Sequence, residues 1–317
     1  MMSATKTEAS VESVETLLRE ELAQGDALIA TATPILRHLL ANDDQALFSD
    51  EVVARVRGMV TDVARQLLHA QAEAGAIVER TAFLSEREDG LAAALIDDPA
   101  FLAHVHALTL EAKLALQLQA RCNIDAVLSP VLQELVASKD DVLAGTAMAV
   151  IAAQARFIQH HRRMALPLGE LPGELFHKAL LAWRKQAGED EAALAAERAL
   201  RDAFDEAHSR LGLLSRLIMR MGRAAPRTLD LDNAGPAMFA TALAMATDQD
   251  RALTVVSFSD RQFARLALAL RAAGLKQPAV EEQFLFLHPG VSLPEGFDKL
   301  SADRASLLLA SSVSQGG

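Results

Sequence analysis

The stretch that decides the fold is residues 138–185, which read SKDDVLAGTAMAVIAAQARFIQHHRRMALPLGELPGELFHKALLAWRK. Ser138 and Asp141 have the spacing of a capping box, in which each side chain satisfies a free backbone donor at a helix start. Apolar residues then recur at helical spacing on both sides of a Pro- and Gly-rich corner at 167–173. Two antiparallel helices joined by such a corner are typical of an α-solenoid or a helical bundle.

Helix start signals recur on both sides of this hairpin. Asp98–Pro99 and Ser129–Pro130 each combine an N-cap residue with proline at the first helical position. The distance from Asp98 to Asp140 falls within the ~40–47 residues of a HEAT- or armadillo-type repeat. We therefore predict an all-α protein, either a HEAT-like α-solenoid or an irregular helical bundle, with a small helical C-terminal unit.

Four further local features refine this picture. One long helix is expected over about 189–221, and Ser259 with Gln262 fits a further capping box. The run 253–258 is β-branched enough for a strand, but it has no strand to pair with. We also expect Trp183 to be buried against the helix that contains Phe157, because the two apolar stripes of the hairpin must face each other.

The helical periodicity of the apolar residues and the positions of Pro and Gly predict the domain organisation. We expect a disordered N-terminus at 1–10, a helical array over 11–222, a linker at 223–235, a small helical C-terminal unit at 236–310 and a disordered tail at 311–317.

Composition limits the classes of partner. The chain of 317 residues is 51% hydrophobic, so a large core can form, but only 4% of its residues are aromatic. Its net charge of −11 opposes binding to nucleic acid, whose phosphates would be repelled. Cys122 is the only cysteine, and the first residues are acidic rather than basic and apolar. We therefore expect an acidic cytoplasmic protein without disulfide bonds.

The strongest local charge feature is a run of arginines at 210–227. No acidic residue lies between His208 and Arg227, and the same segment is rich in leucine. A basic amphipathic helix can lie on an anionic membrane or in an acidic groove of another protein, whereas a core helix with a solvated arginine edge shows the same pattern. The residues of this candidate surface are Arg210, Arg216, Arg220, Arg223 and Arg227.

A second cationic cluster ends the first helix of the hairpin. It consists of His160, His161, Arg162 and Arg163. Positive groups there complement the helix dipole, and they also offer a patch for an acidic partner. Together with the arginine run, these residues form the candidate partner surface.

Two acid–histidine pairs have the spacing of metal ligands. Glu174 with His177, and Asp205 with His208, are each separated by three residues, as in the Glu-x-x-His motif of di-iron bundles. The second pair carries Asp where that motif has Glu, and bridging glutamates are not evident, so we predict that the pairs do not bind metal. We found no glycine-rich phosphate loop, nucleophile elbow or zinc-type Cys/His set in the sequence, and we predict no cofactor.

A late segment suggests a family. The string SDRQFARLALALRAAGL at 259–275, which follows a Pro- and Ala-rich helical array, resembles alphaproteobacterial proteins of domain of unknown function 2336. The resemblance implies a HEAT-like α-helical fold, and it implies neither an activity nor site residues.

Three functions are compatible with these features. The first is a non-enzymatic scaffold or regulatory adaptor that binds another protein along a helix-lined surface. The second is a metal-dependent helical-bundle enzyme that uses the two acid–histidine pairs. The third is a peripheral membrane regulator that uses the Arg-rich segment at 210–227. We expect the first, with another protein as the partner.

Overall fold

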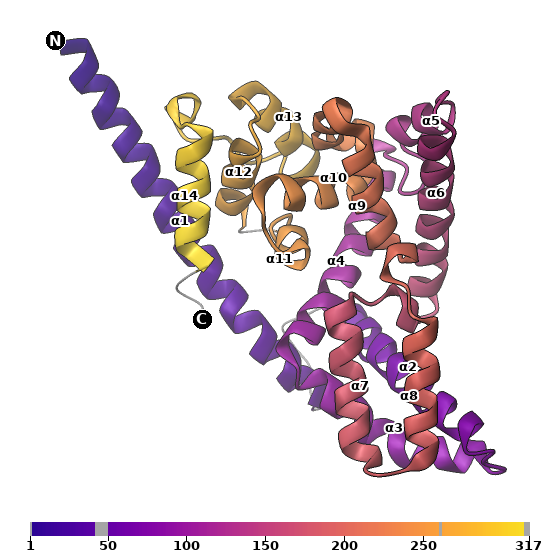
Figure 1. Ribbon diagram of the computed structural model, residues 1–317. Helices are drawn as coiled ribbons and strands as arrows, with labels where there is room; N and C mark the ends of the chain where they lie inside the picture. The colour runs from indigo at the N-terminus through magenta and orange to yellow at the C-terminus, as the bar shows by residue number, and fades with distance from the viewer. Residues whose placement is uncertain (1, 42–49, 260–261, 314–317) are drawn as a thin grey trace. The chain divides into compact units, whose positions relative to one another are not determined.

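The computed structural model describes residues 2–41, 50–259 and 262–313, and these residues form helices but no strand (Figure 1). The prediction of an all-α fold is therefore confirmed. The α-helices are α1 (Met2–Ala41), α2 (Asp50–Ala74), α3 (Arg80–Ile96), α4 (Pro99–Cys122), α5 (Pro130–Val136), α6 (Asp141–Arg162), α7 (Gly173–Ala187), α8 (Glu191–Ala203), α9 (Arg210–Met221), α10 (Leu231–Thr247), α11 (Arg251–Val256), α12 (Phe263–Ala272), α13 (Gln277–Leu287) and α14 (Ala302–Val313). Short 3₁₀ turns are η1 (Leu168–Glu170), η2 (Glu206–His208), η3 (Gly222–Leu229) and η4 (Phe297–Lys299).

Two of the predicted helix starts are confirmed. Pro99 begins α4, and the backbone N–H of Phe101 donates to Asp98 Oδ1 at 2.8 Å. Ser129 caps α5, where its Oγ accepts a hydrogen bond from the N–H of Leu132. Each cap satisfies a backbone donor that the first helical turn leaves free.

Other local predictions are wrong. Asp140, not Ser138, caps α6, and its Oδ1 accepts from the N–H groups of Val142 and Leu143. Residues 253–258 are not a strand, because Asp250 caps a helix there, α11. At the start of α12, Gln262 makes no capping hydrogen bond with its side chain.

The long helix expected over 189–221 is broken into α8, η2 and α9. Asp205 causes the break, since its side chain accepts from the N–H of Ala207 at 2.9 Å and caps η2. Ser209 then takes an extended conformation, and its Oγ accepts from the N–H of Gly212 in the first turn of α9. Local capping therefore outweighs the apolar periodicity that runs through this segment.

Within the described residues the helices form two compact units, each made of segments that are distant in the sequence. The α2 unit comprises Thr33–Ala112 and Lys139–Leu217. The α10 unit comprises Met1–Ala32, Lys113–Ser138 and Ile218–Gly317.

These units differ from the predicted domain organisation. The predicted linker at 223–235 lies within the α10 unit, where η3 packs against α10. The segment 1–10, expected to be disordered, contributes to α1, which begins at Met2. The tail predicted at 311–317 begins inside α14, and its last residues, 314–317, lie outside the described residues.

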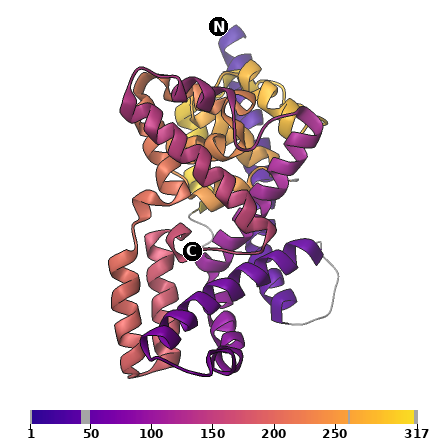
Figure 2. The same cartoon turned by 90° about the vertical axis from the view of Figure 1, so that its right-hand side faces the viewer.

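The core of the α2 unit is built around α2. This helix contacts α3, α7 and α8, and its residues Val56, Val60, Val63 and Leu67 are fully buried at helical spacing. Helices α7 and α8 lie side by side, as both ribbon views show (Figures 1 and 2).

Trp183 is part of the same core. Its side chain is fully buried, and its Nε1–H donates to Gln71 Oε1 at 3.0 Å. The Gln71 amide in turn donates to Asp190 Oδ2. The predicted burial is confirmed, but the main packing partners of α7 are α2, α3 and α8, whereas the sequence predicted the helix that contains Phe157.

The α10 unit is organised around its own buried helix. Every residue from Ala234 to Ala244 is buried, and α10 contacts η3, α5, α11 and α12. A helix that is apolar on all sides belongs in the centre of a domain. Gly235 kinks this helix with φ of 73°, and a Cβ there would lie 3.3 Å from Asp125 O. Glycine is therefore required at this position.

Helix α1 contributes residues 14–32 to the α10 unit by packing on α12 and α14. Leu18 and Leu22 are buried. The amide of Gln262 donates to the carbonyl of Gly25 at 2.8 Å, and Arg304 pairs with Glu15. This part of α1 and α14 run beside each other in Figure 1.

The burial of Trp183 leads to a stability prediction. Trp183→Ala removes the largest fully buried side chain and leaves Gln71 Oε1 without its donor, so it should lower the free energy of unfolding by ~3–5 kcal/mol. Urea unfolding followed by circular dichroism measures the loss. Leu181→Ala, on the exposed side of the same helix, is the control and should change stability by less than about 0.5 kcal/mol. Equal losses in the two variants would contradict the packing described here.

Candidate functional site

Arg210, predicted to be on a partner surface, is buried in the α2 unit. Only 2% of its surface is exposed. Its guanidinium donates to both carboxylate oxygens of Glu111, at 2.5 and 3.1 Å, and to Gln154 Oε1 at 3.2 Å. The prediction is wrong for this residue, because a carboxylate from α4 satisfies the arginine inside the core.

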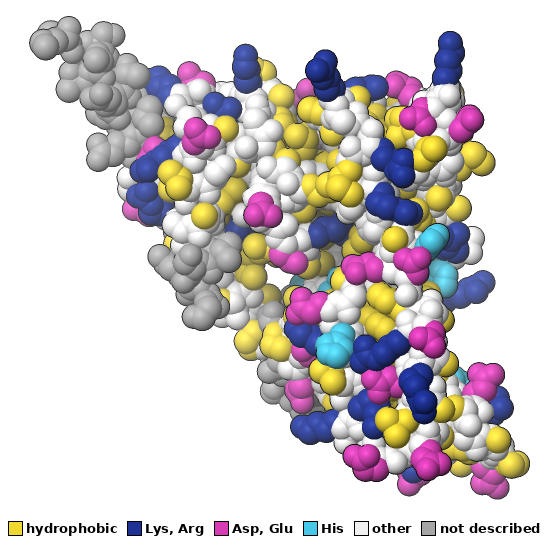
Figure 3. Space-filling view, in the orientation of Figure 1, with side chains coloured by type: hydrophobic (Ala, Val, Ile, Leu, Met, Phe, Trp, Pro, Cys, Tyr) yellow, Lys and Arg dark blue, Asp and Glu magenta, His cyan; other side chains and the backbone are white. Residues whose placement is uncertain are grey.

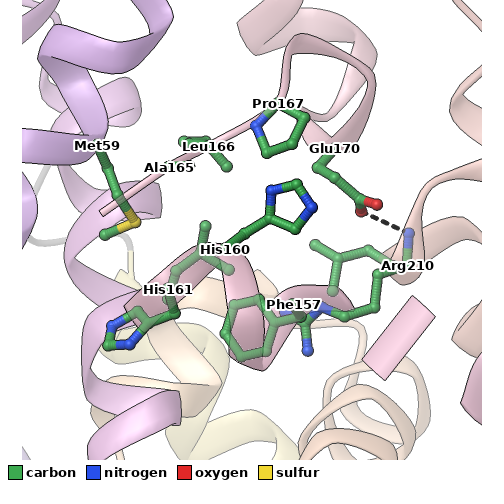
Figure 4. Close-up of a pocket in the computed structure, with 11 residues that line it drawn as sticks. Met59, Phe157, His160, His161, Ala165, Leu166, Pro167, Glu170 and Arg210 are labelled. Atoms are coloured by element: carbon green, nitrogen blue, oxygen red, sulfur yellow. Dashed lines mark hydrogen bonds between the residues drawn. The ribbon is translucent and has the colours of Figure 1, made fainter. Parts of the chain in front are cut away.

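The surroundings of Arg210 complete its environment. The guanidinium carbon lies 3.8 Å from the centroid of the Phe157 ring, a cation–π contact that is strongest where water is excluded. The backbone N–H of Arg210 donates to Glu170 Oε2 at 2.7 Å, the bond drawn in Figure 4. Glu170 thus places a negative charge at the N-terminus of α9, where the helix dipole favours it.

A small cavity lies beside this ion pair. It is lined by Met59, Leu108, Phe157, His160, His161, Ala165, Leu166, Pro167, Glu170, Arg210 and Leu211. Its volume is about 20 Å³, which is room for about one water molecule. The structure therefore brings three of the predicted residues, His160, His161 and Arg210, to one place (Figure 4). The cavity is too small for a cofactor or substrate.

His161 is held as a neutral base in this core. Its carbonyl accepts from Arg55 Nη1 at 3.0 Å, and its Nδ1 lies 3.4 Å from the same nitrogen. Burial, reinforced by the positive charge of Arg55, lowers the pKa of His161 to about 4. The histidine therefore carries no charge at pH 7, and the prediction that it belongs to a cationic surface is wrong.

The remaining predicted cations are divided between the two units. Arg162 and Arg163 are exposed at the end of α6 and Arg216 is half-buried in α9, all in the α2 unit. Arg220, Arg223 and Arg227 are exposed in the α10 unit, and Arg227 pairs with the exposed Glu134 at 2.7 Å. Exposed pairs of this kind contribute at most about 1 kcal/mol.

The first acid–histidine pair is engaged in surface contacts. Glu174 forms an ion pair with Lys178 at 3.0 Å, and that hydrogen bond raises the pKa of Lys178. His177 Nδ1 lies 3.2 Å from Arg201 Nη2. A guanidinium beside the imidazole disfavours a bound cation at that position.

The two residues of the second acid–histidine pair are hydrogen-bonded to each other. His208 Nδ1 lies 2.6 Å from Asp205 Oδ2, and this hydrogen bond lowers the pKa of Asp205. Both side chains are more than half exposed. Within the described ranges no three His, Cys, Asp or Glu side chains converge as metal ligands.

The feature that sequence reasoning missed is the outer face of α6. No charged residue lies between Asp141 and Arg156. Val142 is 54% exposed and Met148 is 60% exposed, and hydrophobic side chains are visible along α6 at the right-hand edge of Figure 3. By length and composition α6 could cross a membrane. Only 22% of its most apolar 18-residue segment is buried within the structure, so most of that segment is not covered by other helices. The sequence signal for this face was the uncharged run itself, because a helix with one buried stripe normally carries charged residues on its other sides.

The buried ion pair predicts a large effect of breaking it. Arg210→Met removes the guanidinium that neutralises the buried Glu111 carboxylate, so it should lower the free energy of unfolding by about 3–5 kcal/mol. Arg220→Met, at an exposed position of the same helix, is the control and should be close to neutral. Urea titrations measure the free energy of unfolding of both variants. A near-neutral effect of Arg210→Met would show that the ion pair does not organise this core.

The pKa of His161 predicts a pH dependence. The folded-state pKa of about 4 lies below the unfolded value of about 6.5, so the unfolded chain binds more protons between these values. The contribution of His161 to the free energy of unfolding should be fully present above pH 6.5. It should be lost as the pH drops toward 4, by up to about 2 kcal/mol between pH 7 and pH 5. His161→Gln should reduce this slope without removing it, because burial also lowers the pKa of His106 to about 4. An unchanged slope in His161→Gln would contradict the buried neutral state.

No protein-family model, curated protein or solved structure matches the chain. The resemblance of residues 259–275 to domain of unknown function 2336 therefore stays a prediction.

Proposed function

We propose that this chain is a non-enzymatic interaction protein, an adaptor whose α6 binds a helix of another protein. The observation that carries the proposal is the outer face of α6, which is uncharged from Val142 to Ala155 and includes strongly exposed apolar side chains. An exposed apolar face of this kind is typical of an interaction site.

The shape of the face favours a helical partner. Gly145 is exposed between the larger Val142 and Met148, and Ala152 is exposed one turn beyond Met148. A Cβ at Gly145 would meet no atom within 4 Å, so the space above it is open. Small residues between larger ones let a second helix approach closely, and an amphipathic helix binds such a groove through apolar residues three and four positions apart.

The ends of α6 define the charge of the partner. Asp140 and Asp141 are exposed at its N-terminal end, whereas Arg156, Arg162 and Arg163 are exposed toward its C-terminal end. Electrostatic complementarity favours a partner helix with basic residues beside the aspartates and acidic residues beside the arginines. This pattern gives the partner a preferred direction along α6.

The packing of the α2 unit supports an irregular bundle rather than the HEAT-like alternative. α2 packs against α7 and α8, which lie about a hundred residues further along the chain. The repeats of a solenoid contact only their neighbours. We therefore propose an irregular helical bundle as the scaffold, in a cytoplasmic protein that does not bind nucleic acid.

Membrane contact is the competing explanation of the same face, since α6 passes the length and composition criteria for a span. Contact through the Arg-rich segment is less favoured than the sequence predicted, because Arg210 is buried. The metal-dependent alternative is less favoured, because His177 Nδ1 lies 3.2 Å from Arg201 Nη2 and His208 Nδ1 lies 2.6 Å from Asp205 Oδ2 at an exposed site.

Gly145 offers a direct test. Gly145→Arg should leave the fold intact, because the site is open, but block close approach of a partner helix. A photo-crosslinker at Met148 in the native cell should capture one defined partner, and Gly145→Arg should reduce the yield at least tenfold. Gly145→Ala is the matched control: it should keep the capture and raise stability by about 0.5–1 kcal/mol.

Three results would contradict the proposal. Capture of the same partner with Gly145→Arg would place the interface elsewhere. Crosslinks between copies of this chain, with a dimer in sedimentation velocity, would make a second copy the occupant. Flotation of the purified protein with anionic vesicles, lost in Gly145→Arg, would make the face a membrane contact.

A further inference from the structure

A second and much larger cavity lies within the α10 unit. Its volume is about 440 Å³, within the range of small-molecule sites. Residues from α1, α11, α12 and α14 line it, namely Arg19, Leu22, Ala23, Asp26, Ala27, Ile29, Ala30, Leu253, Arg265, Ser311 and Ser312. None of these belongs to the candidate surface on α6, so the inference is independent of the proposed function.

Arg265 is the unusual member of this lining. It is 2% exposed, and its Nη2 donates to Asp26 and, at 3.2 Å, to Ser312 Oγ. Its Nε and Nη1 are buried and have no hydrogen-bond partner among the residues that the structure describes. A buried guanidinium that leaves these donors unused is costly, because each N–H has lost its water without gaining an acceptor. An acceptor supplied by a ligand in the cavity would remove that cost.

The charge of the cavity favours an anion. Arg19 and Arg265 contribute two positive charges, and Asp26 is the single acidic residue of the lining. The hydroxyl groups of Ser311 and Ser312 donate to the carbonyls of Leu308 and Leu309, so the two arginines are the donors that the lining offers to an anion.

The rest of the lining is apolar. Leu22, Ile29 and Leu253 provide larger side chains, and Ala23, Ala27 and Ala30 leave room beside them. An inorganic anion would leave this surface unfilled, whereas an apolar ligand would leave Nε and Nη1 of Arg265 without an acceptor. The ligand that satisfies both parts has a carboxylate at one end and a hydrocarbon body at the other.

We infer that this cavity binds a small amphipathic carboxylate, with its oxygens on Arg265 and Arg19 and its hydrocarbon body along α1. The ligand connects α1 with α12 and α14, the elements that supply these residues. Binding therefore stabilises the docking of residues 14–32, and it raises the melting temperature of the protein as any ligand of the folded state does.

Octanoate and 1-octanol, which share a chain length and differ in charge, are the matched probes for titration calorimetry on the full chain. Octanoate should bind saturably, and 1-octanol and inorganic phosphate should bind at least tenfold more weakly. Binding of 1-octanol as tight as that of octanoate would overturn the inference, because the guanidinium would then have no part in recognition.

Variants locate the site. Ala27→Phe and Ala30→Phe fill the cavity from exposed positions of α1 and keep both arginines, so each should abolish octanoate binding with an unchanged circular dichroism spectrum. Arg19→Gln, also exposed, should weaken it several-fold. The double variant Arg265→Gln with Asp26→Asn removes both partners of the buried pair and should reduce the preference for octanoate over 1-octanol, with Arg19 as the remaining cation of the lining. Octanoate binding that survives both cavity-filling variants would place the ligand elsewhere and overturn the inference.

Discussion

The α2 unit depends on the buried ion pair between Glu111 and Arg210. Neither group can remain charged away from water unless its partners are in place, and the pair, Gln154 and the ring of Phe157 provide them. These residues come from α4, α6 and α9, so a single network sets the rotation of three helices. Any rotation of α6 that withdrew Gln154 or Phe157 would leave the guanidinium with fewer contacts.

The same constraint decides which face of α6 is exposed. Successive residues of a helix are separated by about 100°, so Ala152 lies about 200° around α6 from Gln154. Gln154 points into the core, and the uncharged side that contains Gly145, Met148 and Ala152 therefore points outward. The buried network and the proposed interaction surface are two consequences of one helix orientation.

Two local signals predicted the structure correctly. Capping by Asp98 and Ser129 depends on neighbouring residues, and both caps could be predicted. The partner of Arg210 could not be, because Glu111 lies 99 residues away and no pattern in the sequence connects the two. Without that partner, Arg210 resembled the other arginines of its run.

Competing local signals account for most of the other errors. The apolar period that runs through 189–221 hid the break at Asp205, whose side chain caps a new turn. The uncharged run of α6 was visible, but apolar residues in a helix are compatible with a core or with a surface, and only the exposure of Val142 and Met148 distinguishes these. The cavity beside Arg265 required the packing of four helices that are far apart in the sequence.

If α6 binds a partner helix, its outer face is open in the free protein and covered in the cell. Maleimide labelling of single cysteines, in a chain whose Cys122 is replaced by serine, measures this directly. Met148→Cys in the purified protein should react at the rate of an unstructured thiol, whereas Ala153→Cys on the buried face should react far more slowly. In intact cells the cysteine of the Met148→Cys protein should react with maleimide at least several-fold more slowly than in the purified protein. Slow labelling of the purified Met148→Cys protein, or equal rates in the purified protein and in the cell, would contradict the account.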